Sequence, residues 1–253
     1  MTKELIKVEN PLAVPEHLRD IKGHEGLENV RREDLVLPRL AIAQSTSKQL
    51  KPTSPLYIEK LKMGDLFNTV TGDVYGSSVL LIPLIYTASR ILFKDLDEGG
   101  GILCRSFNGR DGGVLSPTCD TCENSKFTKD EKGQNQAPAC TNFMNFPSLL
   151  PEFNNNLIAA SWKSTALKPA STWLTRMQMA NKPMFAAVYE VRSNPDKNAF
   201  GDFYVPTFTL KRWTTADEFT FAKKEYEGLK GRAIKTDESE ADEAPAASEH
   251  VPF

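Results

Sequence analysis

The sequence lacks the long apolar segments that mark membrane and secreted proteins. No apolar run approaches the about 20 residues that a membrane-spanning helix needs. The longest run, VLLIPLI at 79–85, is short and contains Pro83. The N-terminus, MTKELIKVEN, has no apolar stretch of the secretory type. We therefore expect a cytoplasmic protein that does not act at a membrane, with its thiols reduced.

Catalytic signatures are also scarce. The three histidines all lie within the first 24 residues or the last four. The chain has no His-Glu-x-x-His motif, no Walker A loop and no Gly-x-Ser-x-Gly motif. Asp95, Asp97 and Glu98 offer ligands for Mg²⁺, but three glycines follow them and they resemble an ordinary loop. The sequence thus predicts a binding protein and not an enzyme.

Basic residues are missing from the last eighteen positions. Residues 236–253 contain six acidic side chains and no Lys or Arg, which leaves 27 of the 33 acidic residues against 31 Lys and Arg in the rest. A mildly basic body with a wholly acidic tail indicates a nucleic-acid partner. Pro245 and Pro252 and the lack of any period predict that the tail is disordered in isolation.

The body, residues 35–235, reads as mainly β. Alternating or β-branched segments predict a hairpin at 64–76 and strands at 79–86, 89–95, 156–163, 184–193 and 202–213. Two helices are expected: one at 171–181 with Ser171 as its cap, and one that begins at a Thr215–Glu218 capping box and ends near Leu229. Short strands with few helices favour a small closed β-barrel with peripheral helices. Residues 1–34, charged and broken by Pro and Gly, form a flexible arm.

The segment from about 99 to 140 has too few apolar residues for a core of its own. Every cysteine of the chain lies in this segment. The four are Cys104, Cys119, Cys122 and Cys140. The two-residue spacing of Cys119 and Cys122 lets one tight turn present two sulfurs to one ion. Four thiolates suit a single structural Zn²⁺. The alternative is four unrelated reduced thiols.

The end of the chain resembles a known recruiting tail. Residues 236–253 end in Val251-Pro252-Phe253, similar to the acidic tip of bacterial single-strand-binding proteins, which ends Asp-Asp-Asp-Ile-Pro-Phe. In that family the tip recruits replication and repair enzymes, so the resemblance implies that Asp242, Glu243, Pro252 and Phe253 bind such a partner (a polymerase, helicase, primase or recombinase). The alternative is a solubilising tail with an accidental last residue.

Phage single-strand-binding proteins offer a second resemblance, which covers the acidic tail and, in type only, the cysteine-bearing segment. Some of them combine an acidic tail with an OB-fold that carries a zinc-binding insertion, although the zinc site in question uses one His and three Cys. The resemblance implies an OB-type barrel, a structural zinc ion, and binding and protection of single-stranded DNA during phage replication, recombination and repair in the host cytoplasm.

A single-strand binder needs cations for phosphates and aromatic faces for bases. Basic and aromatic residues alternate at several places, and the candidates are Arg90, Lys94, Arg105, Phe107, Trp162, Lys163, Lys168 and Lys211. Trp162 shares its strand face with Ile158 and Ala160, so a place in the core is the competing interpretation. The alternative function is that of a zinc-ribbon accessory factor for transcription or recombination that binds duplex DNA or a protein.

Overall fold

A computed structural model describes residues 26, 28–30, 36–94, 101–129, 133, 135–198, 201–232 and 234–237. The chain divides into two units, Met1–Leu35 and Val36–Phe253, and nearly all described residues belong to the second. The arm at 1–34 and most of the tail at 236–253 therefore lie largely outside the described residues. No described helix is long and apolar enough to cross a membrane.

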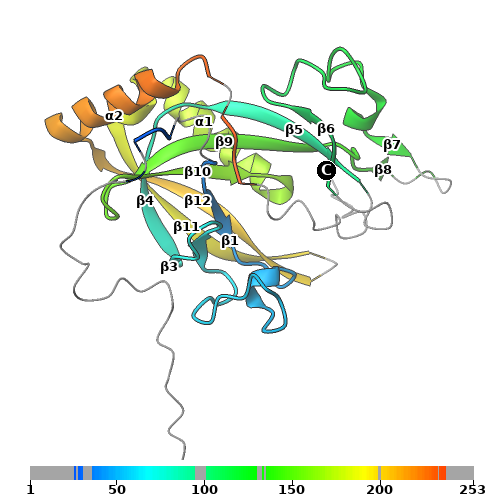
Figure 1. Cartoon of the computed structure of the whole chain (residues 1–253), viewed down its shortest axis with the longest axis horizontal. Helices are drawn as coiled ribbons and strands as arrows, with labels where there is room; N and C mark the ends of the chain where they lie inside the picture. The colour runs from blue at the N-terminus through cyan, green and yellow to red at the C-terminus, as the bar shows by residue number, and fades with distance from the viewer. Residues whose placement is uncertain are drawn as a thin grey trace, which may run out of the picture. The chain divides into compact units, whose positions relative to one another are not determined.

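Within the described residues, ten strands form one mixed sheet and two short strands form a separate hairpin (Figure 1). The strands of the sheet are β1 (Arg39–Ile42), β2 (Leu66–Asn68), β3 (Val74–Gly76), β4 (Ser78–Pro83), β5 (Thr87–Phe93), β6 (Ile102–Ser106), β9 (Thr141–Leu150), β10 (Asn156–Trp162), β11 (Ala187–Asn198) and β12 (Gly201–Trp213). The separate hairpin is β7 (Thr128–Lys129) and β8 (Asn135–Gln136), and the helices are α1 (Leu167–Met179) and α2 (Ala216–Leu229). The prediction of a mainly β protein with peripheral helices is confirmed.

Strands β4 and β5 follow one another along the same edge of β9, with a bend after Pro83. β4 pairs with β11 through residues 78–81 and with β9 through Ile82 and Pro83, and β5 then continues along β9. β9 and β10 form one antiparallel hairpin and β11 and β12 another, and α1 connects the two. A bent first strand that pairs with both the second and the fourth matches the strand order of the OB-type Greek-key barrel.

An additional strand, β1, lies parallel to the open edge of β10. Gln44, two residues after β1, then links this edge to β12. Its side-chain nitrogen donates to the carbonyl oxygen of Tyr204 at 2.8 Å, and its side-chain oxygen accepts from the Tyr204 N–H at 2.9 Å. Its amide thus satisfies both backbone groups of one residue of β12, as a neighbouring strand would.

The inner face of the curled sheet packs around Trp173 of α1. Its ring is 1% exposed and stacks on Phe208 of β12, with ring centroids 4.2 Å apart and planes 4° from parallel. Phe146 of β9 and Tyr189 of β11 contact it at 4.7 and 5.4 Å. α1 therefore covers the barrel core with one face, and its Trp173 side chain contacts strands from both hairpins.

The helix boundaries depart from the sequence prediction at one end. A 3-10 turn, Ser164–Ala166, leads directly into α1, whose N-cap is Ala166 with no side-chain cap bond. Ser171 lies inside the helix, so its assignment as a cap was wrong. For α2 the predicted capping box is confirmed, because Thr215 accepts from the Glu218 N–H and Glu218 accepts from the Thr215 N–H. Arg212 also pairs with Glu218 at 2.6 and 2.8 Å and lowers the pKa of that carboxyl to about 2.

Two apolar layers cover parts of the outer face. α2 packs Ala222 and Leu229 into a cluster that includes Leu149 of β9. At the other end, Leu61 lies in a cluster with Ala41 of β1 and Phe67 of β2. These layers bracket a more polar part of the outer face.

Replacing Gln44 by Ala should lower the free energy of unfolding by about 1–3 kcal/mol, because two partly buried backbone groups of Tyr204 lose their partners. Urea denaturation followed by tryptophan fluorescence measures this. Ser45→Ala, at the exposed neighbouring position, is the control and should be close to neutral. Equal stabilities of the two variants would contradict a role of Gln44 in holding β12.

Candidate functional site

The outer face of the sheet changes character between the two apolar layers. Strand register places Arg39 opposite Ala159, Ser161 opposite Asn145, and Ser89 opposite Phe143, so these side chains share the face turned away from Trp173. Asn145 donates to the Ser89 hydroxyl at 2.9 Å. Polar side chains thus replace the aliphatic ones of the neighbouring clusters at this place.

Two cations lie over one ring on this face. The Arg39 guanidinium carbon is 5.5 Å from the centroid of the Phe143 ring, and Lys163 Nζ is 5.9 Å from it. Lys163 immediately follows β10 in extended conformation, so it continues the alternation from Ser161. Phe143 is only 4% exposed. Its buried ring therefore lies beneath the two cations and attracts them through cation–π contacts.

A third cation extends this arrangement onto β6. Arg105 lies opposite Ile91, which puts it on the same outer face, and its guanidinium carbon is 5.2 Å from the Phe107 ring centroid. Partial burial lowers the pKa of Arg105. Phe107, unlike Phe143, is 45% exposed. We call Arg39, Phe143, Lys163, Arg105 and Phe107 the outer row.

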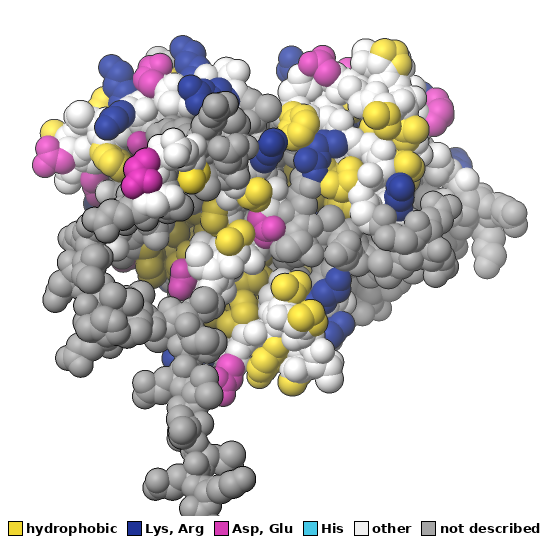
Figure 2. Space-filling model, viewed as in Figure 1, with side chains coloured by type: hydrophobic (Ala, Val, Ile, Leu, Met, Phe, Trp, Pro, Cys, Tyr) yellow, Lys and Arg dark blue, Asp and Glu magenta, His cyan; other side chains and the backbone are white. Residues whose placement is uncertain are grey.

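Figure 2 shows Lys and Arg side chains over α2, over the end that carries the cysteine segment, and between these two ends. The strands of the outer row connect these two ends in Figure 1.

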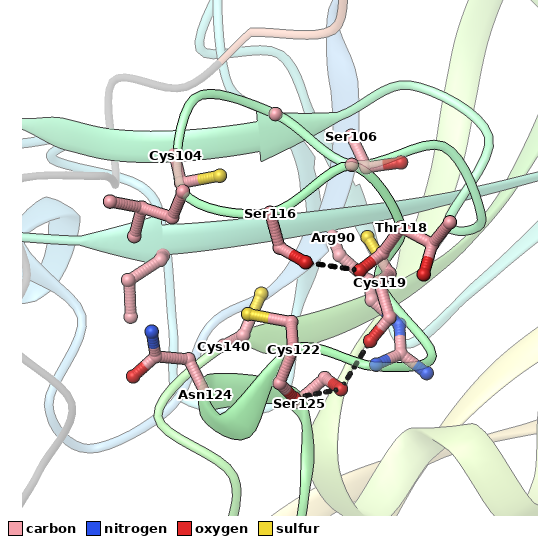
Figure 3. Close-up of a pocket in the computed structure, with 14 residues that line it drawn as sticks. Arg90, Cys104, Ser106, Ser116, Thr118, Cys119, Cys122, Asn124, Ser125 and Cys140 are labelled. Carbon is pink, nitrogen blue, oxygen red and sulfur yellow. Dashed lines mark hydrogen bonds between the residues drawn. The ribbon is translucent and has the colours of Figure 1, made fainter.

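The four cysteines line a single cavity of about 20 Å³ on the opposite face of β5 and β6 (Figure 3). Cys104 comes from β6, Cys119 and Cys122 from the turn that follows, and Cys140 from the residue before β9. No disulfide joins them. The first strand of the segment predicted as an insertion, β6, pairs with β5 and so belongs to the main sheet.

The electrostatics of the cavity favour the neutral form of one thiol, that of Cys140. Burial raises the pKa of Cys140 to about 11, the charge of Cys119 adds to the rise, and Arg90 opposes it. As the described side chains stand, no three His, Cys, Asp or Glu groups already form a metal-ligand set. The structure thus brings the four predicted ligands to one cavity, and zinc binding stays a prediction.

The remaining predicted DNA contacts lie apart from the outer row. Arg90 lines the thiol cavity, so it faces away from Arg105. Trp162 is 3% exposed and packs edge-on against Phe208 inside the barrel, which excludes it from stacking on a base. Lys211 on β12 pairs with Glu190 at 3.4 Å. Lys94 follows β5 and Lys168 is the second residue of α1, and both are exposed but outside the row.

Sequence reasoning missed two members of the row, Arg39 and Phe143. Arg39 is a single cation inside the apolar segment 35–44, and that isolation was the available signal. Phe143 stands close to Met144 and Phe146 in the sequence, so apolar side chains occur at both odd and even positions of this run and no alternation separates the two faces. Only the register with β10 and β5 separates its outward ring from the core.

The predicted partner-binding residues Asp242, Glu243, Pro252 and Phe253 lie outside the described residues. The start of the acidic segment is described. The Leu37 N–H donates to the Lys235 carbonyl oxygen, and the Asp237 N–H donates to the Leu37 carbonyl oxygen, both at 2.9 Å. The first acidic residue of the tail, Asp237, is therefore bonded to Leu37, which lies two residues before Arg39 in the sequence.

Comparison with protein families assigns most of the chain to a family. The family described as Pam3 phage gp34-like protein matches residues 7–235, which includes the outer row, all four cysteines and both helices. Comparison with curated proteins and with solved structures found no match.

Proposed function

Because the chain belongs to the Pam3 phage gp34-like protein family, we propose that it acts in phage DNA metabolism by binding single-stranded DNA without sequence preference along the outer row. The observation that carries the proposal is the position of this row: Phe143 and Lys163 lie on the outer face of the second and third strands of an OB-type barrel, and Arg39 on β1 and Arg105 and Phe107 at β6 extend the row on either side. This is the face that OB-folds use for oligonucleotides. The proposal is of a binding protein and not of an enzyme.

The composition of the row suits a flexible polyanion. Arg39, Lys163 and Arg105 come from three different elements. Lys163 and Arg105 are half-buried and are the candidates for phosphate contacts, whereas Arg39 is only 7% exposed and adds positive charge beside them. Phosphate contacts do not depend on sequence and release counterions. Phe107 is the exposed ring, so it is the candidate for stacking on a base, while the buried ring of Phe143 orients the cations.

The connections around the row fit the same use. In an OB-fold the loop between strands one and two and the loop between strands four and five flank the bound strand. Here the first is the cysteine-bearing segment between β5 and β9, and the second joins β11 to β12. Arg105 and Phe107 lie where the first of these connections leaves the sheet.

Fluorescence anisotropy with a labelled dT oligomer tests the proposal. We expect tight binding to dT, similar binding to a mixed-sequence single strand, and much weaker binding to a duplex of equal length. The logarithm of the binding constant should fall linearly with the logarithm of salt concentration. Equal or tighter binding to the duplex would overturn the proposal and favour a duplex-binding accessory factor instead.

The double variant Lys163→Glu with Arg105→Glu should weaken binding at least tenfold for single strands of any sequence, because two phosphate contacts are lost. The slope of the logarithm of the binding constant against the logarithm of salt concentration should become shallower by about 1.4. Phe107→Ala should lower the affinity for dT about tenfold and leave the slope of the salt dependence nearly unchanged, because stacking involves no charge. The controls are Lys224→Glu on exposed α2 and Val114→Ala, 83% exposed on the cysteine segment. Loss of affinity in the controls to the same degree would place the site elsewhere.

We further propose that the acidic tail competes with DNA for the outer row and recruits a replication protein when DNA displaces it. The pairing of Leu37 with Lys235 and Asp237 holds the start of the tail near Arg39. Five carboxylates follow in residues 238–253, and a tether this short gives them a high effective concentration at the row. The recruiting role rests on the resemblance of Val251-Pro252-Phe253 to the bacterial tip.

Deleting residues 238–253, while keeping Asp237 and its bond to Leu37, should tighten dT binding at low salt and have little effect at high salt, because screening removes the competition. Deleting Phe253 alone is the matched control for charge and should leave dT affinity unchanged. That shorter deletion should instead weaken binding to a purified replication protein of the phage. Unchanged dT affinity of the long deletion at low salt would contradict the competition.

A further inference from the structure

The cysteine-bearing segment has almost no hydrophobic core. Among its described residues, 101–129 and 135–140, Cys119 is the one apolar side chain that is buried. Larger apolar side chains are exposed instead, Val114 at 83% and Phe127 at 58%. Ordering the backbone of so many residues costs about 1–2 kcal/mol each. Apolar burial within the segment does not offset that cost, so the segment needs another source of stability.

The backbone of the segment converges on the cysteines. The Cys119 N–H donates to the Arg110 carbonyl at 2.8 Å, the Cys122 N–H to the Cys119 carbonyl at 3.3 Å, and the Cys140 N–H to the Asn124 carbonyl at 2.8 Å. The Ser125 hydroxyl donates to the carbonyls of both Cys119 and Cys122. These bonds hold the turn with two thiols against Cys140, the residue before β9, which supplies the fourth thiol.

The loop between β6 and this turn packs so closely on its neighbours that two of its positions have no room for a side chain. A Cβ on Gly113 would lie 2.6 Å from Cys104 Sγ and 2.7 Å from the Arg105 carbonyl oxygen, and one on Gly112 would lie 1.6 Å from the Ser116 carbonyl oxygen. Only glycine fits at both positions. The loop therefore packs directly on the Cys104 thiol and on the backbone of β6.

The cavity fits one small occupant. Its volume of about 20 Å³ corresponds to about one water-sized body. Among the described residues, its lining includes four thiols and one cation, Arg90, and no carboxylate or imidazole. Four thiols without a carboxylate select a soft or borderline cation. The guanidinium of Arg90 offsets part of the net charge that four thiolates and one divalent ion leave.

We propose that Cys104, Cys119, Cys122 and Cys140 bind one Zn²⁺ as thiolates. The bound ion would hold β6 in place, so that Arg105 stays in the outer row and can bind DNA. Binding forms four Zn–S bonds, and the thiols release their protons to solvent. The sulfurs reach the ion by rotation of their side chains inside the cavity. The second half of the proposal rests on the proposed function, because Cys104 points into the cavity while its neighbour Arg105 points into the outer row.

Cobalt substitution tests the metal site without reference to DNA. Protein purified under reducing conditions and stripped of metal by a chelator is titrated with Co²⁺. We expect intense visible d–d bands of a tetrahedral ion and near-ultraviolet thiolate charge transfer, complete at one equivalent and abolished by Zn²⁺. Cys140→Ser should lose the charge-transfer intensity and bind much more weakly, and Ser106→Ala, which removes a hydroxyl from the same cavity, should retain both.

Three results would overturn the metal site: a pale octahedral spectrum, saturation well below or above one equivalent, or fewer than four thiols that react with an alkylating reagent in unreduced, denatured protein. The last would reveal disulfides. For the coupling, the stripped protein should bind dT at least tenfold more weakly and recover with Zn²⁺, and an unchanged affinity would refute it. A cobalt-binding protein with no affinity for dT with or without metal would instead refute the proposed function and leave the metal site standing.

Discussion

The stacking of Trp173 on Phe208 is the contact on which the rest of the structure depends. It joins α1 to β12, and the same indole contacts β9 and β11, so it determines which face of each strand is interior. Strand side chains alternate between faces. Once Met144, Phe146 and Trp162 point inward, Phe143 and Lys163 must point outward. The cations of the outer row and the aromatic core are thus two consequences of one register.

The same alternation makes β6 the point where the two candidate sites meet. Cys104 and Ser106 face the thiol cavity, and Arg105 between them faces the outer row. A change at the cavity that shifts β6 would move Arg105, since both side chains depend on the pairing of β6 with β5. This is the physical reason to connect the proposed metal binding with the proposed DNA binding, although the two candidate sites lie on opposite faces of one sheet.

Much of the fold followed from the sequence, because its strands are rich in β-branched and aromatic residues and Thr215–Glu218 is a self-contained capping signal. The sequence misled where a tertiary contact decided the outcome. α1 begins four residues before Ser171 because a 3-10 turn leads into it. Trp162 lies inside because Phe208 packs on it. β6 joins the main sheet although its flanks are rich in glycine. Arg39 and Phe143 became candidates only through pairing with distant strands.

The central claim is that single-stranded DNA lies along the outer row, and hydrogen–deuterium exchange with and without a saturating dT oligomer tests it most directly. The account predicts that protection on binding concentrates in β9, in β10 through Lys163, and in β6 with Phe107, while α2 exchanges as before. Protection confined to α2 or to the outer edge of β12, or none in these three strands despite saturation, would contradict it.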